Sequence, residues 1–387
     1  MSLIKSLKRK IYKAAREPAY ALAVLIKRFA SLFSYYVFQG RSSWPETVSL
    51  FLTYRCNLAC SMCGYWGKCG SLKDKKEDCL REDLNLQDLE KIIDDIAGLA
   101  PNITLFGGEP FLYPDWPVLV KYIKNKGLRC NVVTNGTLLA AREQEVIDSG
   151  LDEIIFSLEG TQEIHDKITN TLGSFDKAFN ALSKIAKLKK MNNLRLPKIN
   201  VATTISEDNF SNLYEIFKTA EKLSPDTITF HHLSFVDRES VAKTNRILKD
   251  NFGILSRDWE GFIRNELPKI DTAVLIEEIK KIESYPKACG VFFYPDFRQK
   301  EIIEYYKDFN FKSKQFANRC LSPWMTVYIF PDGKVGPCEE LNIYFGNIKK
   351  ESFKDIWNNQ QFCKFRKILK RERIFPVCTR CTELYRF

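Results

Sequence analysis

The sequence predicts an α/β protein built on a parallel β-sheet, in the form of an open, partial (β/α)6 barrel. Apolar, alternating runs recur between residues 47 and 235, and helical patterns of ten residues or more separate them. This order is typical of a parallel sheet. Six such units are too few for a closed eightfold barrel. The first run leads into a loop with three cysteines, at the edge where α/β barrels assemble their chemistry.

The expected elements alternate along the chain. The strand candidates are residues 47–53, 103–106, 129–133, 153–158, 198–205 and 227–232. The helical patterns between them lie near residues 86–98, 115–126, 140–149, 174–190 and 209–222. In the helix expected over 174–190, Ser174 is predicted to cap the N-terminus, and Phe175, Ala178 and Leu182 share one apolar face.

Residues 1–46 are predicted to form a basic, amphipathic helical segment. Residues 1–41 carry nine basic side chains and one acidic side chain, and so most of the chain's formal charge of +11. An apolar stripe at helical spacing contains Leu22, Leu25, Ile26, Phe29, Leu32, Phe33 and Tyr36. Lys27 and Arg28 lie at its centre, where each would cost about 2.5–3.5 kcal/mol in a bilayer, so a transmembrane helix is rejected. A helix in the membrane interface and a helix packed on the barrel remain equal alternatives.

Two further segments flank the predicted barrel of residues 47–235. Pro18 is expected to separate the apolar helix from an earlier basic helix that contains Leu3, Leu7 and Ile11. Residues 236–315 are charged and aromatic, with helical patches at 242–249 and 274–282, and are interpreted as a connector that shapes a substrate cavity. Because the basic charge is concentrated at the N-terminus, no nucleic-acid partner is expected.

Twelve cysteines stand in a sequence that shows no signal-peptide pattern. A protein with many cysteines and no export signal is expected in the reducing cytosol. There the cysteines are more often metal ligands than disulfide partners. We therefore expect a cytoplasmic protein, with a peripheral contact to the inner membrane face through residues 1–40 as an option.

Cys56, Cys60 and Cys63 crowd into one turn-sized loop after the first strand. Three thiolates cannot all pair as disulfides, and the spacing matches no common zinc site. They can ligate three irons of a [4Fe–4S] cluster and leave the fourth iron open. One βα unit later, Gly107-Gly108-Glu109-Pro110 follows the second strand. Paired glycines let backbone approach a ligand, and a glutamate can accept from an ammonium group.

The spacing C-x3-C-x2-C after a strand, joined to this Gly-Gly-Glu motif, resembles the radical SAM superfamily. The resemblance implies that S-adenosylmethionine (SAM) chelates the open iron and that the Gly-Gly-Glu motif holds its amino group. Ser157 would contact the ribose or carboxylate, and the backbone of Leu233 the adenine. The SAM-binding residues that it implies are Met62, Gly107, Gly108, Glu109, Asn135, Ser157 and Leu233.

The sequence departs from the family pattern after the fourth strand. Glu159 stands where many relatives have Asp, and His165-Asp166 resembles the His-Asp pair that commonly follows, with a structural role at a helix entry as the favoured alternative for His165. No Arg follows within residues 167–173, where many relatives have one, so the SAM carboxylate contact and any catalytic residue stay unassigned. The adjacent His231 and His232 would point to opposite faces of a strand, so no histidine metal site is proposed.

A second cysteine set lies in residues 316–387 and contains Cys320, Cys338, Cys378 and Cys381. Its first two members flank a predicted β-hairpin with its turn at residues 332–333. Four thiolates can hold zinc or a [4Fe–4S] cluster, and zinc is the commoner match for a closing C-x2-C. Downstream of a radical SAM core, however, the pattern resembles the SPASM/twitch extension in its short, 2-deoxy-scyllo-inosamine dehydrogenase-like form. This implies one auxiliary [4Fe–4S] cluster. The remaining cysteines, expected to be buried or free, are Cys69, Cys79, Cys130, Cys289 and Cys363.

The resemblance implies a radical SAM enzyme that cleaves SAM reductively to a 5′-deoxyadenosyl radical and abstracts hydrogen from a substrate, with the auxiliary cluster carrying electrons. A flavodoxin or ferredoxin is the implied reductant. About forty-five residues precede the first strand, too few for a separate peptide-recognition domain. A small molecule (a sugar or cyclitol, or a lipid-linked compound) is therefore preferred, and a peptide maturase of the RiPP or sulfatase-maturase type is the alternative. A zinc-stabilised RNA-binding or RNA-modifying protein is a more remote one.

Overall fold

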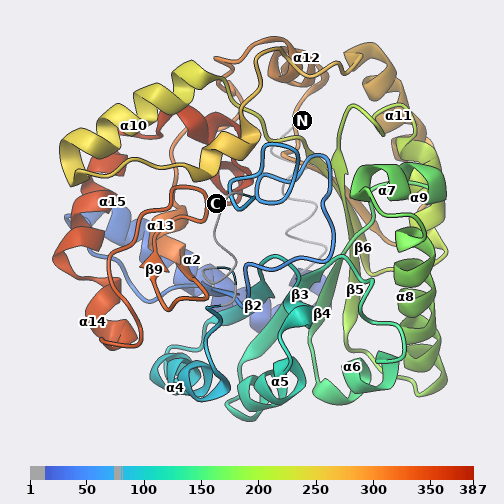
Figure 1. The fold of residues 1–387 in the computed structure, drawn as a ribbon, viewed down its shortest axis with the longest axis horizontal. Helices are drawn as coiled ribbons and strands as arrows, with labels where there is room; N and C mark the ends of the chain where they lie inside the picture. The colour runs from blue at the N-terminus through green and yellow to red at the C-terminus, as the bar shows by residue number, and fades with distance from the viewer. Residues whose placement is uncertain (1–13, 74–79, 81) are drawn as a thin grey trace.

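The computed structural model describes residues 14–73, 80 and 82–387, and a single curved sheet organises them (Figure 1). Within those residues the sheet has nine strands in the order β7-β6-β5-β4-β3-β2-β1-β8-β9. The strands are β1 (Thr47–Phe51), β2 (Asn102–Phe106), β3 (Arg129–Thr134), β4 (Glu153–Ser157), β5 (Lys198–Ile205), β6 (Thr227–His232), β7 (Gly290–Tyr294), β8 (Thr326–Ile329) and β9 (Val335–Gly336). All neighbouring strands from β7 to β8 pair in parallel, and β9 pairs antiparallel with β8. The predicted α/β barrel is confirmed.

Helices cover the outer face of this sheet, and Figure 1 shows α4, α5, α6 and α8 outside the strands. Their apolar faces explain the packing: α4, for instance, is capped by Asn85 and buries Leu89, Ile92, Ile93 and Ile96. The helices are α2 (Pro18–Val37), α4 (Leu86–Ala97), α5 (Trp116–Asn125), α6 (Glu143–Ser149), α7 (Gln162–Thr169), α8 (Ser174–Met191), α9 (Leu213–Glu221), α10 (Arg238–Phe252), α11 (Thr272–Ser284), α12 (Gln299–Lys307), α13 (Ser322–Met325), α14 (Phe353–Trp357) and α15 (Gln360–Glu372).

The sheet extends beyond the six predicted strands at both ends. The segment 236–315, interpreted as a connector, contributes β7, which pairs in parallel with β6. The C-terminal segment contributes β8, which pairs in parallel with β1. The run Gly290–Tyr294 was missed because its five residues lie in a charged and aromatic stretch without clear alternation. The boundary at residue 235 therefore does not mark the end of the sheet.

The capping of α8 also differs from the prediction. Gly173, with a φ of +76°, is the N-cap residue, and Ser174 is the first helical residue. Asp166 supplies the cap from α7: its carboxylate accepts hydrogen bonds from the backbone N–H of Gly173 (2.7 Å) and Phe175 (2.8 Å) and from Ser174 Oγ (2.9 Å). A tertiary contact therefore replaces the expected local one.

The apolar N-terminal helix begins at Pro18 as predicted, and α2 runs to Val37. The earlier helix expected around Leu3, Leu7 and Ile11 lies outside the described residues. Within the described residues, no helix combines the length and hydrophobicity needed to span a membrane.

Candidate functional site

The three-cysteine loop lies where the carboxyl end of β1 leaves the sheet. Tight turns fold it back on itself: Cys63 N–H donates to the Cys60 carbonyl (3.0 Å), and Gly67 N–H donates to the Cys63 carbonyl (2.9 Å). All three thiols are half-buried. Burial raises the pKa of Cys56 to about 12 and also raises that of Cys60, and the negative charges of the neighbouring thiols raise both further. The three sulfurs therefore lie close enough together to influence one another's ionisation.

The Gly-Gly-Glu turn packs directly on the chain that enters this loop. Gly108 N–H donates to the Thr53 carbonyl and Glu109 N–H to the Arg55 carbonyl, both at 2.8 Å. A Cβ on Gly108 would lie 2.0 Å from the Arg55 carbonyl oxygen, and Gly107 adopts a φ of +148°. The glycines are thus required for backbone–backbone contact, in addition to any role in approaching a ligand.

Glu109 is buried and held by three hydrogen bonds. Its carboxylate accepts from Thr134 Oγ1 (2.8 Å), Phe111 N–H (3.1 Å) and Asn135 N–H (2.9 Å). Burial raises the pKa of Glu109 to about 7, against these hydrogen bonds, which lower it. A bound ammonium group, such as the amino group of SAM, would stabilise the ionised carboxylate of Glu109.

Asn135 and Ser157 follow the carboxyl ends of β3 and β4. Asn135 Nδ2 donates to Asn57 Oδ1 (3.0 Å), so the third strand is linked to the cysteine loop. Ser157 is the last residue of β4 and is half-buried. Met62, in the cysteine loop, is half-buried against the main core. The fold brings these three positions to the same rim, where the SAM contacts are predicted.

Glu159 was noted in the sequence but not included among the predicted site residues. Its Oε2 accepts from Thr204 N–H (2.8 Å), burial raises its pKa to about 8, and its charge in turn raises the pKa of Cys60. His165 Nδ1 accepts from the Glu159 backbone N–H (3.1 Å). Burial lowers the pKa of His165 to about 4, so the imidazole is neutral. This supports the structural role for His165.

Leu233 is buried after β6, and its carbonyl accepts a hydrogen bond from Tyr305 Oη (2.7 Å). That carbonyl is therefore already used by α12. Beside it, His232 Nδ1 lies 2.9 Å from Tyr306 Oη.

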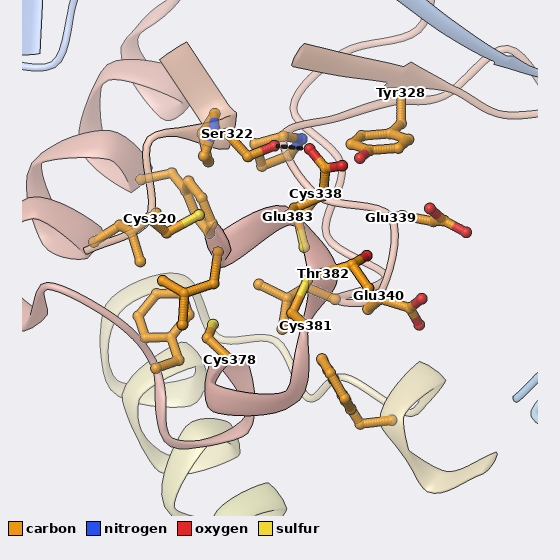
Figure 2. A pocket seen from close by; sticks show the side chains of 18 residues that line it. Cys320, Ser322, Tyr328, Cys338, Glu339, Glu340, Cys378, Cys381, Thr382 and Glu383 are labelled. Atoms are coloured by element: carbon orange, nitrogen blue, oxygen red, sulfur yellow. Dashed lines mark hydrogen bonds between the residues drawn. The ribbon is translucent and has the colours of Figure 1, made fainter. Parts of the chain in front are cut away.

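Cys320, Cys338, Cys378 and Cys381 line one cavity, and Figure 2 shows them around it. Burial raises the pKa of each of the four thiols, and for three of them the charge of neighbouring thiols adds to the rise. Apolar side chains of α15 and the C-terminal turns, among them Phe365, Leu369 and Phe375, close the cavity. No three His, Cys, Asp or Glu side chains among the described residues are arranged for a single metal ion. The convergent thiols and the cavity fit a larger sulfur-ligated group.

The other described cysteines do not join either set. Cys130 is buried in β3, Cys289 and Cys363 are half-buried, and Cys69 is exposed. Cys79 lies outside the described residues. The four described thiols agree with the expectation of buried or free cysteines.

A contact between the two cysteine sets was missed in the sequence. Tyr65, two residues after Cys63, donates its hydroxyl to Oε1 of Glu339, the residue after Cys338 (3.3 Å). Between these segments, Phe51 and Phe330 stack at 5.8 Å, and Phe51 meets the ring of Tyr65 edge-on at 5.7 Å. Only the parallel pairing of β1 with β8 brings these segments together, because they are some 270 residues apart in the sequence.

The connector also reaches this site. Residues 261–262 pack so closely on the cysteine loop that a Cβ on Gly261 would lie 1.9 Å from the Gly64 carbonyl oxygen. Trp259 lines the cavity of the second cysteine set. Residues 236–315 therefore contact both cysteine sets, and their role in shaping a substrate cavity stays a prediction.

Comparison with protein-family models identifies both parts of the chain. Residues 50–220 match the model of the radical SAM superfamily, and residues 320–382 match SPASM, an iron–sulfur cluster-binding domain. The chain belongs to the radical SAM superfamily, in its SPASM branch. Radical SAM and SPASM domains indicate iron–sulfur clusters and SAM as cofactors, which favours that interpretation of the cysteines over a zinc-stabilised scaffold.

Relatives of this radical SAM enzyme cover most of its length. It is 25% identical over 360 residues to the Fe-coproporphyrin III synthase of Methanosarcina barkeri, covering 90% of this chain and 82% of the relative. It is 27% identical to an AdoMet-dependent heme synthase of the same organism, over 87% of this chain and 88% of the relative. A Bacillus subtilis protein of subtilosin (bacteriocin) biosynthesis is 24% identical, over 81% and 60%.

Among solved structures, Streptococcus suis SuiB bound to its precursor peptide SuiA superposes with a TM-score of 0.62 at 14% identity. The match covers 96% of this chain and 82% of that chain. This likeness establishes the fold.

Proposed function

We propose that this radical SAM enzyme holds a SAM-binding [4Fe–4S] cluster on Cys56, Cys60 and Cys63. The observation that carries the proposal is the Gly-Gly-Glu turn packed on that loop, with a buried carboxylate aimed at the same rim. When bound, SAM and the cluster supply a 5′-deoxyadenosyl radical that abstracts hydrogen from the substrate. Glu109 accepts the methionine ammonium, and Asn135 and Ser157 orient the nucleoside at the carboxyl ends of β3 and β4.

The second cysteine set is proposed to hold one auxiliary [4Fe–4S] cluster with four protein ligands. Its role is to carry electrons, since a fully ligated cluster has no open position for a substrate. The Tyr65–Glu339 hydrogen bond and the aromatic rings beside it link the two cysteine sets. A flavodoxin or ferredoxin is the proposed source of the electron.

For the substrate, we favour a peptide over the sugar, cyclitol or lipid-linked compound preferred from the sequence. Subtilosin biosynthesis, and the maturation of sporulation killing factor by another Bacillus subtilis relative at 24% identity, support this choice. The short N-terminal segment, which argued against a peptide, is compatible with it when recognition uses the barrel itself.

A second candidate is a tetrapyrrole, because the first relatives named above are synthases of heme and Fe-coproporphyrin III. We rank it second, because the two relatives of peptide maturation are joined by a solved structure that holds a precursor peptide. Figure 2 shows Glu339 and Glu340 directed away from the four sulfurs. Among the residues that line the cavity are these two glutamates and Glu383, with no Lys, Arg or His. Burial raises the pKa of both Glu339 and Glu340, so this wall of the cavity carries little charge, as suits the proposed cluster.

Anaerobic reconstitution with iron analysis and SAM cleavage tests the cofactor assignment. The wild type is expected to bind about eight irons, and Cys60→Ala about four, with loss of 5′-deoxyadenosine formation. Cys378→Ala is expected to lose the auxiliary signal while cleavage continues. Cys69→Ala, at an exposed cysteine, is the matched control. Retained SAM cleavage in Cys60→Ala would contradict the assignment of the SAM-binding cluster to this loop.

The substrate class is tested by incubating the reduced enzyme and SAM with synthetic peptides or with Fe-coproporphyrin III. Mass spectrometry follows loss of hydrogen or of CO2. We expect modification of a peptide and no change in the tetrapyrrole. Conversion of Fe-coproporphyrin III would replace the peptide proposal by the second candidate.

A further inference from the structure

Helix α2 turns its polar side toward the protein. Lys27 Nζ donates to the carbonyls of Leu99 (2.9 Å) and Ala100 (2.5 Å). Arg28 donates twice to the carboxylate of Glu46, at 2.6 and 2.9 Å. Both charged side chains of the helix therefore form hydrogen bonds to other parts of the protein. The small side chains of Ser31 and Ser34 are buried on the same side of the helix.

The partners of this polar side lie at the amino ends of the strands. Glu46 directly precedes β1, and Leu99 and Ala100 precede β2. Glu17, next to α2, forms ion pairs with Arg129 and Lys198, the first residues of β3 and β5. The helix thus lies across the end of the barrel opposite the cysteine loop. Since this end presents charges and free peptide groups, it selects the polar face of the helix.

The predicted apolar stripe consequently faces solvent. Phe29 is 74% exposed, Ile26 62% and Leu25 61%. The exposed members of the stripe, with those that continue it at the C-terminal end, are Leu22, Leu25, Ile26, Phe29, Phe33, Tyr36, Val37 and Phe38. The helix contains no Asp or Glu. A contiguous apolar surface of this kind is unusual in a monomer and marks an interaction site.

Basic groups border the C-terminal end of the stripe. Arg319 donates to the hydroxyl of Tyr36, and Lys370 Nζ donates to the Tyr35 carbonyl (2.5 Å). Arg41 and Arg373 are exposed nearby, on the segments that flank these contacts. An apolar stripe beside cationic side chains is the pattern of helices that bind anionic lipid surfaces.

We propose that the exposed face of α2 docks this protein on the surface of an anionic lipid bilayer, with the helix lying in the interface. A second copy of the chain suits the surface less well, because the helix that would meet the basic border has no Asp or Glu to pair with it. Even without the inward-facing Lys27 and Arg28, basic side chains outnumber the one acidic side chain in residues 1–41, which adds to the attraction for anionic lipid.

This docking has a consequence for the substrate. The carboxyl ends of the strands, with the cysteine loop, lie at the far end of the barrel from α2. The candidate site therefore opens away from the bilayer. A substrate reaches it from the aqueous side, so the basic helix does not favour a lipid-linked substrate.

Flotation of the full-length reconstituted protein with vesicles tests the proposal. With vesicles of phosphatidylcholine and about one-third phosphatidylglycerol, we expect the wild type to float, and to float less in high salt or with phosphatidylcholine alone. The double variant Leu25→Ser/Phe29→Ser is expected to bind the vesicles at least about tenfold more weakly than the wild type. Met191→Ser, at an 80% exposed apolar residue outside α2, is the matched control.

SAM cleavage shows that each variant is folded, and it is expected to be unchanged in both. If the double variant fails to fold, Leu25→Ser alone replaces it in the flotation test and is expected to bind at an intermediate level. No flotation of the wild type, or flotation of the double variant at the wild-type level, would overturn the proposal. So would a wild-type dimer in light scattering that becomes a monomer in the double variant without vesicle binding. None of these outcomes bears on SAM chemistry.

Discussion

Glu109 is the residue whose environment gives the sharpest expectation for SAM binding. Its buried carboxyl has a pKa raised to about 7 when SAM is absent. A SAM ammonium needs the ionised form, so binding below pH 7 must release a proton. We expect the dissociation constant for SAM to rise by about tenfold per pH unit below 7.

Glu109→Gln is expected to bind SAM more weakly at every pH and to lose this pH dependence. Equilibrium dialysis of reconstituted protein at several pH values measures both effects. Glu163→Gln, at an exposed glutamate of α7, should behave as the wild type. An unchanged pH slope in Glu109→Gln would remove Glu109 from ammonium binding.

His165 gives a prediction for stability. Its pKa is lowered to about 4 in the folded protein, so between pH 6.5 and pH 4 the unfolded chain binds the proton more tightly. The contribution of neutral His165 to the free energy of unfolding is therefore complete above pH 6.5 and is lost as the pH falls toward 4. At pH 5 the loss is about 2 kcal/mol.

Urea unfolding at pH 7 and pH 5 measures this loss. We expect His165→Asn to be less stable than the wild type at pH 7 and to change less between the two pH values. An equal change in both proteins would show that His165 does not titrate in this way.

Among the elements, α8 shows how a tertiary contact replaces a local cap. Three hydrogen bonds converge on the Asp166 carboxylate, and one of them comes from Ser174. We expect Asp166→Ala to lower the free energy of unfolding by about 1–2 kcal/mol. Ser174→Ala is expected to cost less, since it removes one of the three hydrogen bonds. Denaturant unfolding of the two variants checks the order, and the reverse order would restore Ser174 as the cap.

Helix α2 shows the limit of an amphipathic pattern. The spacing of Leu25, Ile26 and Phe29 predicted a helix with one apolar face, and the helix is there. The usual assumption that this face packs inward is wrong here, because the end of the barrel is polar. A hydrophobic pattern specifies that a face exists, while the surface that it meets decides which face is buried.

At the scale of the whole molecule, the C-terminal quarter is part of the main sheet. Since β8 pairs with β1, a chain ending at residue 315 would leave one edge of the apolar strand β1 without a partner. We expect this truncated chain to be insoluble or to aggregate. Cys378→Ser, which keeps β8, should stay soluble, as sedimentation after expression will show. A soluble, monomeric truncated chain would indicate that the two parts fold independently.

The sequence by itself determined much of this protein. The spacing of Cys56, Cys60 and Cys63 and the Gly-Gly-Glu turn identified the family, since short motifs are set by local geometry. Alternating runs located six strands, and the four later cysteines converge on one cavity as expected.

Only the tertiary structure decided which distant segments meet. The addition of β7 and β8 to the sheet, the Tyr65–Glu339 contact and the Asp166 cap each join residues through the fold. The outward turn of α2 belongs with them. Local periodicity encodes what a segment can form, whereas the polarity of the surface beside it, which many segments build together, decides where that segment packs.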